Sequence, residues 1–208
     1  MIPYKIVYFG HFTKKDPMED KKFNPEHRKT LNNPDRLEKL APRKIWEFIN
    51  YKRPEKIIDI GAGTAFITAA LGELAPRAQI DAFDIEPVMV AEMRSSLPEY
   101  SRITPHLMID NKLPVSDEYA DIVWMINLFH ELRKPNLLLR EIKRVLKPYG
   151  KLLIIDWAKK QEACESGPPL DHRVDEATMT SLMVDADFSN IKTTEEFTDH
   201  LGVLGTRL

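Results

Sequence analysis

Cysteine is almost absent from this 208-residue chain, in which Cys164 is the single thiol. An intrachain disulfide is therefore excluded, and so is a zinc site built from several cysteines. Long apolar runs are also missing, because the opening stretch Ile6–Phe9 is far too short for a signal-peptide core or a transmembrane helix. Neither sign of charge dominates, since 30 Lys and Arg stand against 32 Asp and Glu. These absences predict a cytoplasmic protein with no membrane insertion and no nucleic-acid partner.

Hydrophobic residues make up 43% of the chain, which at this length is enough for a substantial core. We therefore expect a single domain over residues 1–208. No internal repeat or low-complexity tract is visible in it. Prolines break the first fifty residues repeatedly, and only Arg43–Tyr51 has a firm helical pattern there.

The segment Lys56–Thr64 carries the strongest local signal, a short apolar run that leads into two closely spaced glycines. Gly61 and Gly63 lack a Cβ, can adopt positive φ and let a ligand approach the main chain closely. The apolar positions from residue 64 to residue 74 predict a helix that Pro76 stops. Such a strand, loop and helix can bind a nucleotide-like ligand, but the motif alone does not say which one.

The rest of the chain alternates between strand and helix patterns. Four further strands are predicted before residue 158: Ile80–Asp84, Ile103–Ile109, Asp121–Ile126 and Lys151–Trp157. Between the last two, a helical apolar face runs over Leu138–Leu146 and ends by Pro148. Three more elements follow: a helix at about Asp175–Asp185 and two short strands, at about Asn190–Phe197 and from His200 onward. The alternation predicts an α/β fold with a mostly parallel, doubly wound sheet that helices cover on both faces.

The polar residues at strand ends are candidates for a ligand site, because ligands of doubly wound sheets bind beyond the carboxyl ends of the strands. Asp84 ends the second predicted strand, 23 positions after Gly61, close to where a ribose-binding carboxylate is expected. It could instead cap the helix that opens at Pro87. Phe66 occupies the position of the third glycine in a dinucleotide fingerprint, which favours a cofactor without a diphosphate.

With these features the chain resembles the class I S-adenosylmethionine-dependent methyltransferases. In its cofactor half it also resembles the ubiquinone and menaquinone biosynthesis methyltransferases, which belong to that class. The resemblance covers about Pro54–Trp157. Its motifs, in order, are Asp59–Thr64, Phe83–Ile85, Ile109–Asn111 with Leu113-Pro114, Asp121–Val123 through Asn127–Leu132, and Glu141–Gly150 with Leu152–Asp156. Ala65 is a departure, because many family members carry glycine there. Since alanine is small and favours helices, we expect the cofactor site to tolerate it.

The resemblance implies a Rossmann-like, mostly parallel seven-stranded sheet with the last strand antiparallel. It implies S-adenosylmethionine as cofactor, S-adenosylhomocysteine as its product, and transfer of a methyl group to an acceptor. We expect residues 1–50 to form an N-terminal lid and helical segment, 54–157 the cofactor-binding core, and 158–208 an acceptor-side loop, helix and terminal strands. Because this leaves no room for a separate substrate domain, a small-molecule acceptor is favoured.

The resemblance also implies a cofactor-binding role for specific positions: Asp59, Gly61, Ala62, Gly63, Asp84, Ile85, Asp110, Asn111 and Asn127. The glycine loop would line the methionine and ribose portion, with Asp84 on the ribose hydroxyls and Asp59 toward the methionine amino group. Asp110, Asn111 and Ile85 would surround the adenine. In each case a structural role is the alternative: Asp110 could start a turn, and Asn127 could cap a helix.

His130 follows the fourth predicted strand and is the first candidate for a base that removes a proton from the acceptor, with Glu131 beside it. Trp157, His172 and Arg173 could form the acceptor wall, where Arg173 would suit an anionic group. The alternatives are that His130 packs under the following loop and that Arg173 pairs with a nearby carboxylate.

No metal site is expected, because the histidines lack the close spacing of zinc motifs. The N-terminal segment is expected to fold over the cofactor, with His27 or Tyr4 near the acceptor. Two other functions stay open: a non-catalytic S-adenosylmethionine-binding module and a nicotinamide-dependent oxidoreductase. The identity of the acceptor, the atom that is methylated and the oligomeric state are not encoded in any motif that we recognise.

Overall fold

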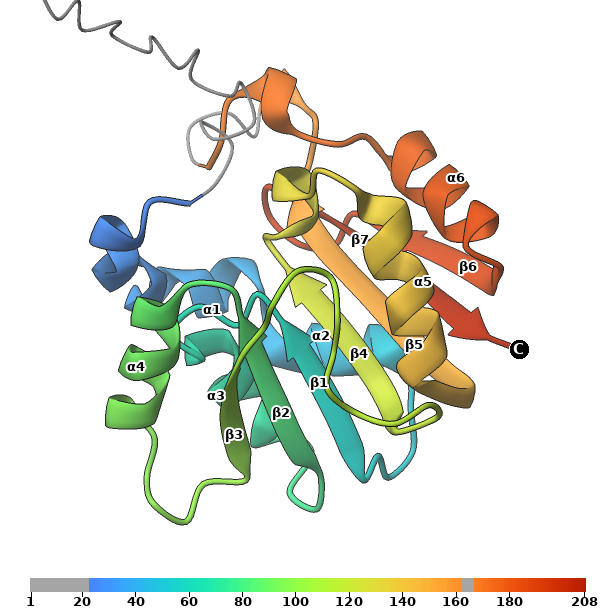
Figure 1. The fold of residues 1–208 in the computed structure, drawn as a ribbon. Helices are drawn as coiled ribbons and strands as arrows, with labels where there is room; N and C mark the ends of the chain where they lie inside the picture. The colour runs from blue at the N-terminus through green and yellow to red at the C-terminus, as the bar shows by residue number, and fades with distance from the viewer. Residues whose placement is uncertain (1–22, 162–166) are drawn as a thin grey trace, which may run out of the picture.

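The structure is a computed structural model that describes residues 23–161 and 167–208. Figure 1 shows how its helices and strands are arranged. In chain order they are the 3-10 helix η2 (Pro25–Asn32), α1 (Asp35–Lys39), α2 (Pro42–Ile49), β1 (Lys56–Ile60), α3 (Phe66–Gly72), β2 (Gln79–Asp84), α4 (Pro87–Ser96), β3 (Ile103–Leu107), β4 (Ala120–Ile126), η3 (Phe129–Glu131), α5 (Pro135–Val145), β5 (Leu146–Trp157), η5 (Leu170–His172), α6 (Glu176–Asp185), β6 (Phe188–Thr194) and β7 (His200–Arg207).

The strands form one seven-stranded sheet in the order β3-β2-β1-β4-β5-β7-β6. The pairs from β3 to β5 are all parallel, whereas β7 runs antiparallel to both β5 and β6. The predicted fold class is therefore confirmed, including the antiparallel last strand. The chain leaves β1 toward β2 and β3 on one side and later returns to β4 on the other, so the order of strands reverses between β1 and β4.

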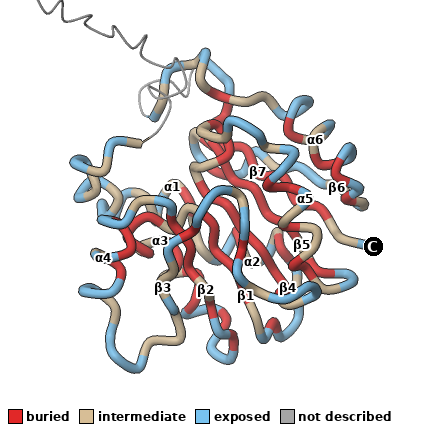
Figure 2. The backbone as a smooth tube through the Cα atoms, in the orientation of Figure 1, coloured by how far each residue is buried: buried red, intermediate tan, exposed pale blue. Residues whose placement is uncertain are grey.

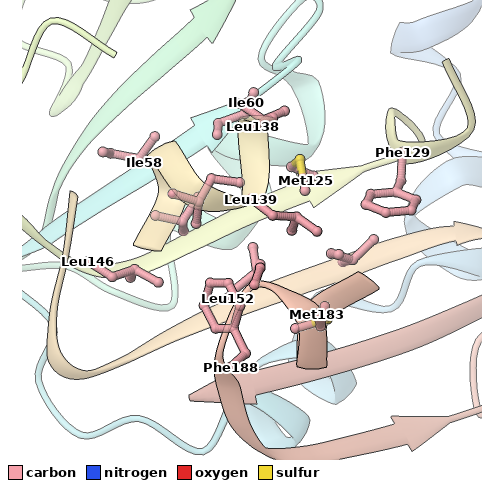
Figure 3. Close-up of a cluster of buried hydrophobic side chains, with 14 of the residues drawn as sticks. Ile58, Ile60, Met125, Phe129, Leu138, Leu139, Leu146, Leu152, Met183 and Phe188 are labelled. Carbon is pink, nitrogen blue, oxygen red and sulfur yellow. The ribbon is translucent and has the colours of Figure 1, made fainter. Parts of the chain in front are cut away.

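Two apolar layers cover the sheet because alternate residues of each strand point to opposite faces. On one face, α5 and α6 pack through residues such as Leu139 and Met183 onto Ile58 and Leu152, as Figure 3 shows. On the other face, α2 and α3 pack onto alternate positions that include Ile57. The inner strands β1, β2, β5 and β7 are buried along most of their length and β4 along all of it, whereas the outer strands β3 and β6 are largely unburied (Figure 2). Each fully buried Leu or Ile side chain stabilises the fold by about 1.5–3 kcal/mol.

Short local signals fix where several helices begin. Proline stands in the first turn of α2, α4 and α5, where its missing N–H is not needed. Asp175 caps α6 by accepting a hydrogen bond from the Thr178 N–H at 2.8 Å. The predicted end of the fifth helix differs from the structure, since α5 ends at Val145 and Leu146 pairs with Ala120 as the first residue of β5.

The parallel topology brings the carboxyl ends of β1, β2, β4 and β5 to one edge of the sheet. The opposite ends of the strands are held together by Asp121, the second residue of β4. Its carboxylate accepts hydrogen bonds from the N–H groups of Glu55 and Lys56 at 2.8 and 2.9 Å, and from Lys147 Nζ at 2.8 Å. This ties the entry into β1 to β4, and the strand ends at the other edge are therefore held at fixed positions.

Candidate functional site

The carboxyl ends of the strands border a cleft with a volume of about 1360 Å³. Its walls come from the loops after β1, β2, β3 and β4, from the end of β5, from residues 167–169 and from the segment 23–40. The cleft lies at the reversal of strand order between β1 and β4, where ligands of doubly wound sheets bind. The residues predicted to bind the cofactor all line it, as do the predicted catalytic residues except Arg173.

The glycine loop after β1 takes a conformation that other residues resist. Gly61 and Gly63 have φ values of +74° and +58°, in the left-handed region. A Cβ at Gly61 would lie 2.8 Å from Leu128 Cδ2, and one at Gly63 would lie 3.0 Å from Leu31 Cδ1. The backbone conformation therefore favours glycine at both positions, and a Cβ would in addition displace the end of a leucine side chain.

The amides of this loop already have acceptors within the protein. The N–H groups of Gly61 and Ala62 donate to the Phe83 carbonyl at 2.8 and 3.0 Å. The Gly63 N–H donates to Asp84 Oδ2 at 2.8 Å. The loop thus offers a ligand close main-chain contact rather than free donors, and these hydrogen bonds lock its position relative to β2.

Asp84 is buried at the end of β2, where it is only 8% exposed. Its Oδ1 accepts from the Glu86 N–H at 2.9 Å, and Oδ2 holds Gly63. Burial raises the pKa of Asp84, and the hydrogen bonds from Glu86 and Gly63 oppose that rise. A carboxylate has about four acceptor positions, so the two that remain can receive the two hydroxyls of a ribose. The residue at the cap of α4 is Glu86 rather than Asp84.

Asp59 and Asn127 stand at the ends of the two neighbouring strands β1 and β4. Asp59 is buried and accepts from Thr68 Oγ1 at 2.6 Å. Burial raises its pKa to about 6, while the Thr68 hydrogen bond and the charge of Arg36 act against the rise. Asn127 has a φ of +58°, and its buried Oδ1 has no hydrogen-bond partner among the described residues. That unpaired oxygen needs a donor, which a ligand in the cleft can supply.

Apolar side chains are exposed at the β2 and β3 end of the cleft. Ile85 is 43% exposed and Ile109 is 71% exposed. Asp110 and Asn111 occupy the turn between Ile109 and Lys112, and Asp110 has a φ of +56°. A flat ring could pack on these apolar side chains while its edge meets the polar turn.

His130 and Asp156 form a buried pair across the ends of β4 and β5. The Nδ1 atom of His130 is 2.7 Å from Asp156 Oδ1, and its backbone N–H donates to Oδ2 at 2.9 Å. Because a carboxylate only accepts, the pair places a hydrogen on Nδ1 and leaves Nε2 as the basic nitrogen of the neutral ring. Burial disfavours the charged ring, but the hydrogen bond and charge of Asp156 overcome this and raise the pKa of His130.

Glu131 faces the same imidazole, with Oε1 3.8 Å from His130 Nε2. The same carboxyl oxygen accepts from the Phe23 N–H at 3.1 Å. Burial raises the pKa of Glu131 to about 7, and the charge of His130 acts in the opposite direction. The cleft therefore holds an imidazole and a carboxyl group side by side, each with a raised pKa.

Trp157 and His172 line the cleft beyond this pair, together with His200 at the start of β7. The rings of Trp157 and His200 lie 4.3 Å apart between centroids. A Cβ on Gly167 would lie 2.5 Å from the Trp157 indole, so this glycine lets the 167–169 loop press against the ring. The result is an aromatic wall beside the acidic and imidazole groups.

Arg173 stands behind this wall rather than in it. It is 2% exposed, its Nε donates to the Pro168 carbonyl and its Nη1 to the Ala158 carbonyl, both at 2.9 Å. Its guanidinium carbon lies 5.5 Å from the centre of the Trp157 ring. In this arrangement Arg173 supports Trp157 and the 167–169 loop.

Sequence reasoning overlooked Asp156, His200 and Arg36, which all belong to the cleft or to its charge network. Asp156 could have been found, because it ends the fifth strand as Asp84 ends the second. His200 could also have been found, since the first residue of an antiparallel strand lies at the carboxyl edge of its parallel neighbours. Arg36 has no comparable signal in the sequence.

The N-terminal segment borders the cleft through Phe23, Leu31 and Arg36, whereas His27 is exposed and does not line it. Tyr4 lies outside the described residues, as does Cys164. Within residues 23–161 and 167–208, no group of three or more His, Cys, Asp or Glu could hold a metal ion. No helix in this part of the chain is long and apolar enough to cross a membrane.

Comparison with known proteins gives consistent matches. Residues 58–154 match the family described as "Methyltransferase domain". The ubiquinone/menaquinone biosynthesis C-methyltransferase UbiE of Burkholderia multivorans is 27% identical over 166 residues, which are 75% of this chain and 68% of that protein. UbiE of Burkholderia mallei is 31% identical over 115 residues, so this chain spans about half (47%) of its length. A crystal structure of an S-adenosylmethionine-dependent methyltransferase from Aquifex aeolicus has a TM-score of 0.82 at 28% identity, covering 90% of this chain and all (100%) of that one.

Proposed function

The chain is a class I S-adenosylmethionine-dependent methyltransferase related to the UbiE proteins, and from this premise we propose that it methylates a small-molecule acceptor by direct in-line displacement. The observation that carries the proposal is that the residues proposed to hold the cofactor and those proposed to act on the acceptor line one continuous cleft. The glycine loop and Asp84 lie in it, and so do His130, Glu131 and Trp157. Its 1360 Å³ exceeds the roughly 300–1,000 Å³ of a pocket for one drug-sized ligand, which leaves room for a cofactor and a second small molecule.

The residues of the first half fit S-adenosylmethionine. Asp84 has acceptor positions for the ribose hydroxyls, and Ile85 offers an exposed apolar surface for the adenine. Asp110 and Asn111 can meet the ring edge. The unpaired Oδ1 of Asn127, with Asp59 nearby at the end of the adjacent strand, suits the ammonium of the methionine end. Nothing among the family matches favours a nicotinamide cofactor.

The bound cofactor supplies an activated methyl group on a sulfonium, which a nucleophile can take by attack in line with the bond that breaks. The protein then has to align the acceptor, exclude water and remove a proton from an O–H or N–H acceptor. His130 is placed for the last task, because Asp156 fixes the hydrogen on Nδ1 and leaves Nε2 as the base. Glu131 can take the proton onward, since its pKa is raised to about 7 by burial.

We assign the aromatic wall of Trp157, His172 and the 167–169 loop to the acceptor. Arg173 acts there by holding Trp157 and the loop in place, as its contacts with the Ala158 and Pro168 carbonyls indicate. A wall of this kind inside a cleft suits a small compound.

The test is to incubate the protein with methyl-labelled S-adenosylmethionine and a cell extract separated into low-molecular-mass, protein and nucleic-acid fractions. We expect the label in the low-molecular-mass fraction. Label that enters only protein or nucleic acid would contradict the proposed acceptor class. The labelled compound is then the substrate for the next measurement.

Replacement of His130 by alanine tests the proposed mechanism. We expect the rate of methyl transfer to fall by about 10²–10⁴-fold because the base is lost, with little change in the affinity for S-adenosylhomocysteine measured by calorimetry. His27→Ala is the matched control, since His27 is exposed and lies outside the cleft lining. An unchanged rate in His130→Ala would remove His130 from the mechanism.

A further inference from the structure

His200 lines the cleft and has no role in the transfer proposed above. It is the first residue of β7, and it pairs there with Trp157, the last residue of β5. In the sheet, β7 lies on the far side of β5 from β4 and β1, whose carboxyl ends are assigned to the cofactor (Figure 1). A ligand group that contacts His200 therefore belongs to the acceptor and not to the cofactor.

The protein fixes which nitrogen of this ring carries the hydrogen. His200 Nδ1 lies 2.7 Å from the Thr198 carbonyl oxygen. Because a carbonyl only accepts, Nδ1 is the donor, and Nε2 of the neutral ring is left as an acceptor. Burial lowers the pKa of His200, while the Thr198 carbonyl and the charge of Asp156 oppose the change. The ring is therefore neutral near neutral pH and presents a lone pair rather than a charge.

This Nε2 is buried and has no hydrogen-bond partner among the described residues. The two ring nitrogens lie on opposite sides of the imidazole, so Nε2 faces away from the Thr198 turn. Asn127 is the other described residue of the cleft lining with such an unpaired atom, and it is assigned to the methionine end of the cofactor. Since buried acceptors nearly always meet a donor, the Nε2 of His200 needs one from outside the described part of the chain.

The cations closest to this wall are already engaged elsewhere. Lys39 lines the cleft but forms an ion pair with Asp199 at 2.7 Å, and Arg173 donates to two backbone carbonyls behind Trp157. The Trp157 and His200 rings are tilted by 31° at a centroid distance of 4.3 Å. The wall therefore combines an apolar surface with one accepting nitrogen, which suits a neutral donor and opposes an anion.

We propose that His200 selects the acceptor by accepting a hydrogen bond through Nε2 from a neutral O–H or N–H group, separate from the atom that is methylated. His130 acts on the reacting group, and His200 holds the second one. The acceptor is then a compound with a hydrogen-bond donor beside its reacting group and no anion at this wall. This role of His200 rests on the transfer to a small molecule proposed above and adds the class of group that the protein recognises there.

The experiment uses three probes of similar size: phenol, which has an O–H donor, anisole, in which that donor is methylated, and benzoate, which is an anion. Each is titrated into the full chain saturated with S-adenosylhomocysteine and labelled with ¹⁵N in its histidines. Long-range ¹H–¹⁵N NMR follows the imidazole nitrogens. We expect phenol, but not anisole or benzoate, to shift the His200 Nε2 resonance. Phenol should bind about 3- to 10-fold more tightly than anisole, the range of one neutral hydrogen bond.

Two variants separate the roles of the two ring nitrogens. His200→Asn places an amide nitrogen near the position of Nδ1, where it can still donate to the Thr198 carbonyl, but lacks an acceptor at Nε2. His200→Gln is one carbon longer and brings an amide oxygen near the position of Nε2. We expect His200→Asn to lose the preference for phenol over anisole and His200→Gln to keep it. His27→Asn is the control, because His27 is exposed and lies outside the cleft lining.

A preference for phenol that survives in His200→Asn would overturn the role of His200 and assign the O–H to His130. Tighter binding of benzoate than of phenol would overturn it as well. So would a His200 Nε2 resonance that phenol leaves unchanged, and this wild-type measurement decides if the variants do not fold. A protein that labels low-molecular-mass compounds but fails this test keeps the proposed function. One that does not bind S-adenosylhomocysteine loses the proposed function and the role of His200 with it.

Discussion

Asp156 shows how one buried carboxylate sets the chemistry of its neighbours. It is fully buried and accepts hydrogen bonds from the His130 backbone, from His130 Nδ1 and from the Trp157 N–H, the last at 2.7 Å. The first two fix both the position and the tautomer of the ring, and the third fixes the start of the aromatic wall. The proposed base and the proposed acceptor wall are therefore positioned by the same group.

Replacement of Asp156 by asparagine removes the charge of this side chain and nearly keeps its shape. In the wild type, the charge of Asp156 raises the pKa of His130 above its ordinary value of 6.5 against the effect of burial. Without that charge burial dominates, so we expect the pKa to fall below 6.5, as followed by NMR of the imidazole Cε1 proton. Because the neutral ring is the proposed base, any acid limb of the transfer rate should move to lower pH. The rate at its maximum should fall by about 10²–10⁴-fold, since the amide no longer fixes the tautomer.

Glu131→Gln is the companion variant, since Glu131 also titrates in the cleft. If the pKa of His130 stays raised in Asp156→Asn but falls in Glu131→Gln, then Glu131 and not Asp156 controls the imidazole.

Residues of the site could be predicted from the sequence where a strand end places them. Asp84 ends one predicted strand and His130 follows another. Both are found because ligands of doubly wound sheets bind beyond the carboxyl ends of the strands. Arg36 could not be predicted in this way, because it comes from a five-residue helix whose position depends on the contact of Asn32 with Thr64. His200 was within reach of the sequence, because the predicted antiparallel direction of the last strand places its first residue beside the carboxyl ends of the parallel strands.

At the scale of the elements, the glycine loop joins α3 through a strained residue. Ala65 has a φ of +61° and stands at the cap of α3, in the left-handed region, although the sequence suggested an ordinary helical alanine. Its methyl group is buried against Ala82, Val90 and Met93 of the β2 and α4 layer. The left-handed conformation costs about 1 kcal/mol for a residue with a Cβ, and the buried methyl group contributes about 0.8 kcal/mol.

These two effects nearly cancel in Ala65→Gly. We expect its free energy of unfolding, measured in urea, to change by less than about 1 kcal/mol, with S-adenosylhomocysteine affinity retained. Ala65→Val adds a branched side chain at positive φ and should destabilise the protein by about 2 kcal/mol or more. Ala69→Val in the middle of α3 is the control, and an equal loss there would contradict a special strain at Ala65.

Element positions follow from the sequence where burial repeats regularly. Three predicted strands correspond to β1, β2 and β4. Wherever a first or last residue was predicted for them, it lies within one residue of the observed one. The helix before β5 was predicted to include Leu146, because its apolar spacing continues that of α5, but pairing with Ala120 places Leu146 in the strand. The strand predicted at about Asn190–Phe197 lies at Phe188–Thr194, and its irregular register around Asn190, which has a φ of +51°, has no sequence period that would reveal it.

At the scale of the whole molecule, carboxyl groups at the two ends of the parallel strands have pKa values shifted in opposite directions. Lys147 and the N–H groups of Lys56 and Glu55 lower the pKa of Asp121 despite burial, so this edge loses stability as the pH falls through that pKa. At the cleft, burial raises the pKa of Asp59 to about 6 and that of Glu131 to about 7. Burying these carboxyl groups in the cleft therefore lowers the free energy of unfolding near neutral pH, while it leaves them in position to contact a ligand.

The sign of this effect can be measured on Glu131. Its folded pKa of about 7 lies above the ordinary 4.5, so the native state binds the proton more tightly than the unfolded chain. The resulting stability is fully present below about pH 4.5 and is lost as the pH rises through about 7, by on the order of 3 kcal/mol. We expect Glu131→Gln, which cannot ionise and can still accept from the Phe23 N–H, to flatten the decline in unfolding free energy between pH 5 and pH 8.

Glu38→Gln is the control, because Glu38 is an exposed glutamate of α1 outside the cleft lining. Urea unfolding at a series of pH values, without ligand, gives the comparison. His130 contributes with the same sign, since its raised pKa also adds stability that is lost as the pH rises, so part of the decline should remain in Glu131→Gln. A wild type whose stability rises steadily from pH 5 to pH 8 would contradict the raised pKa values, and with them the proton exchange between His130 and Glu131 on which the proposed mechanism depends.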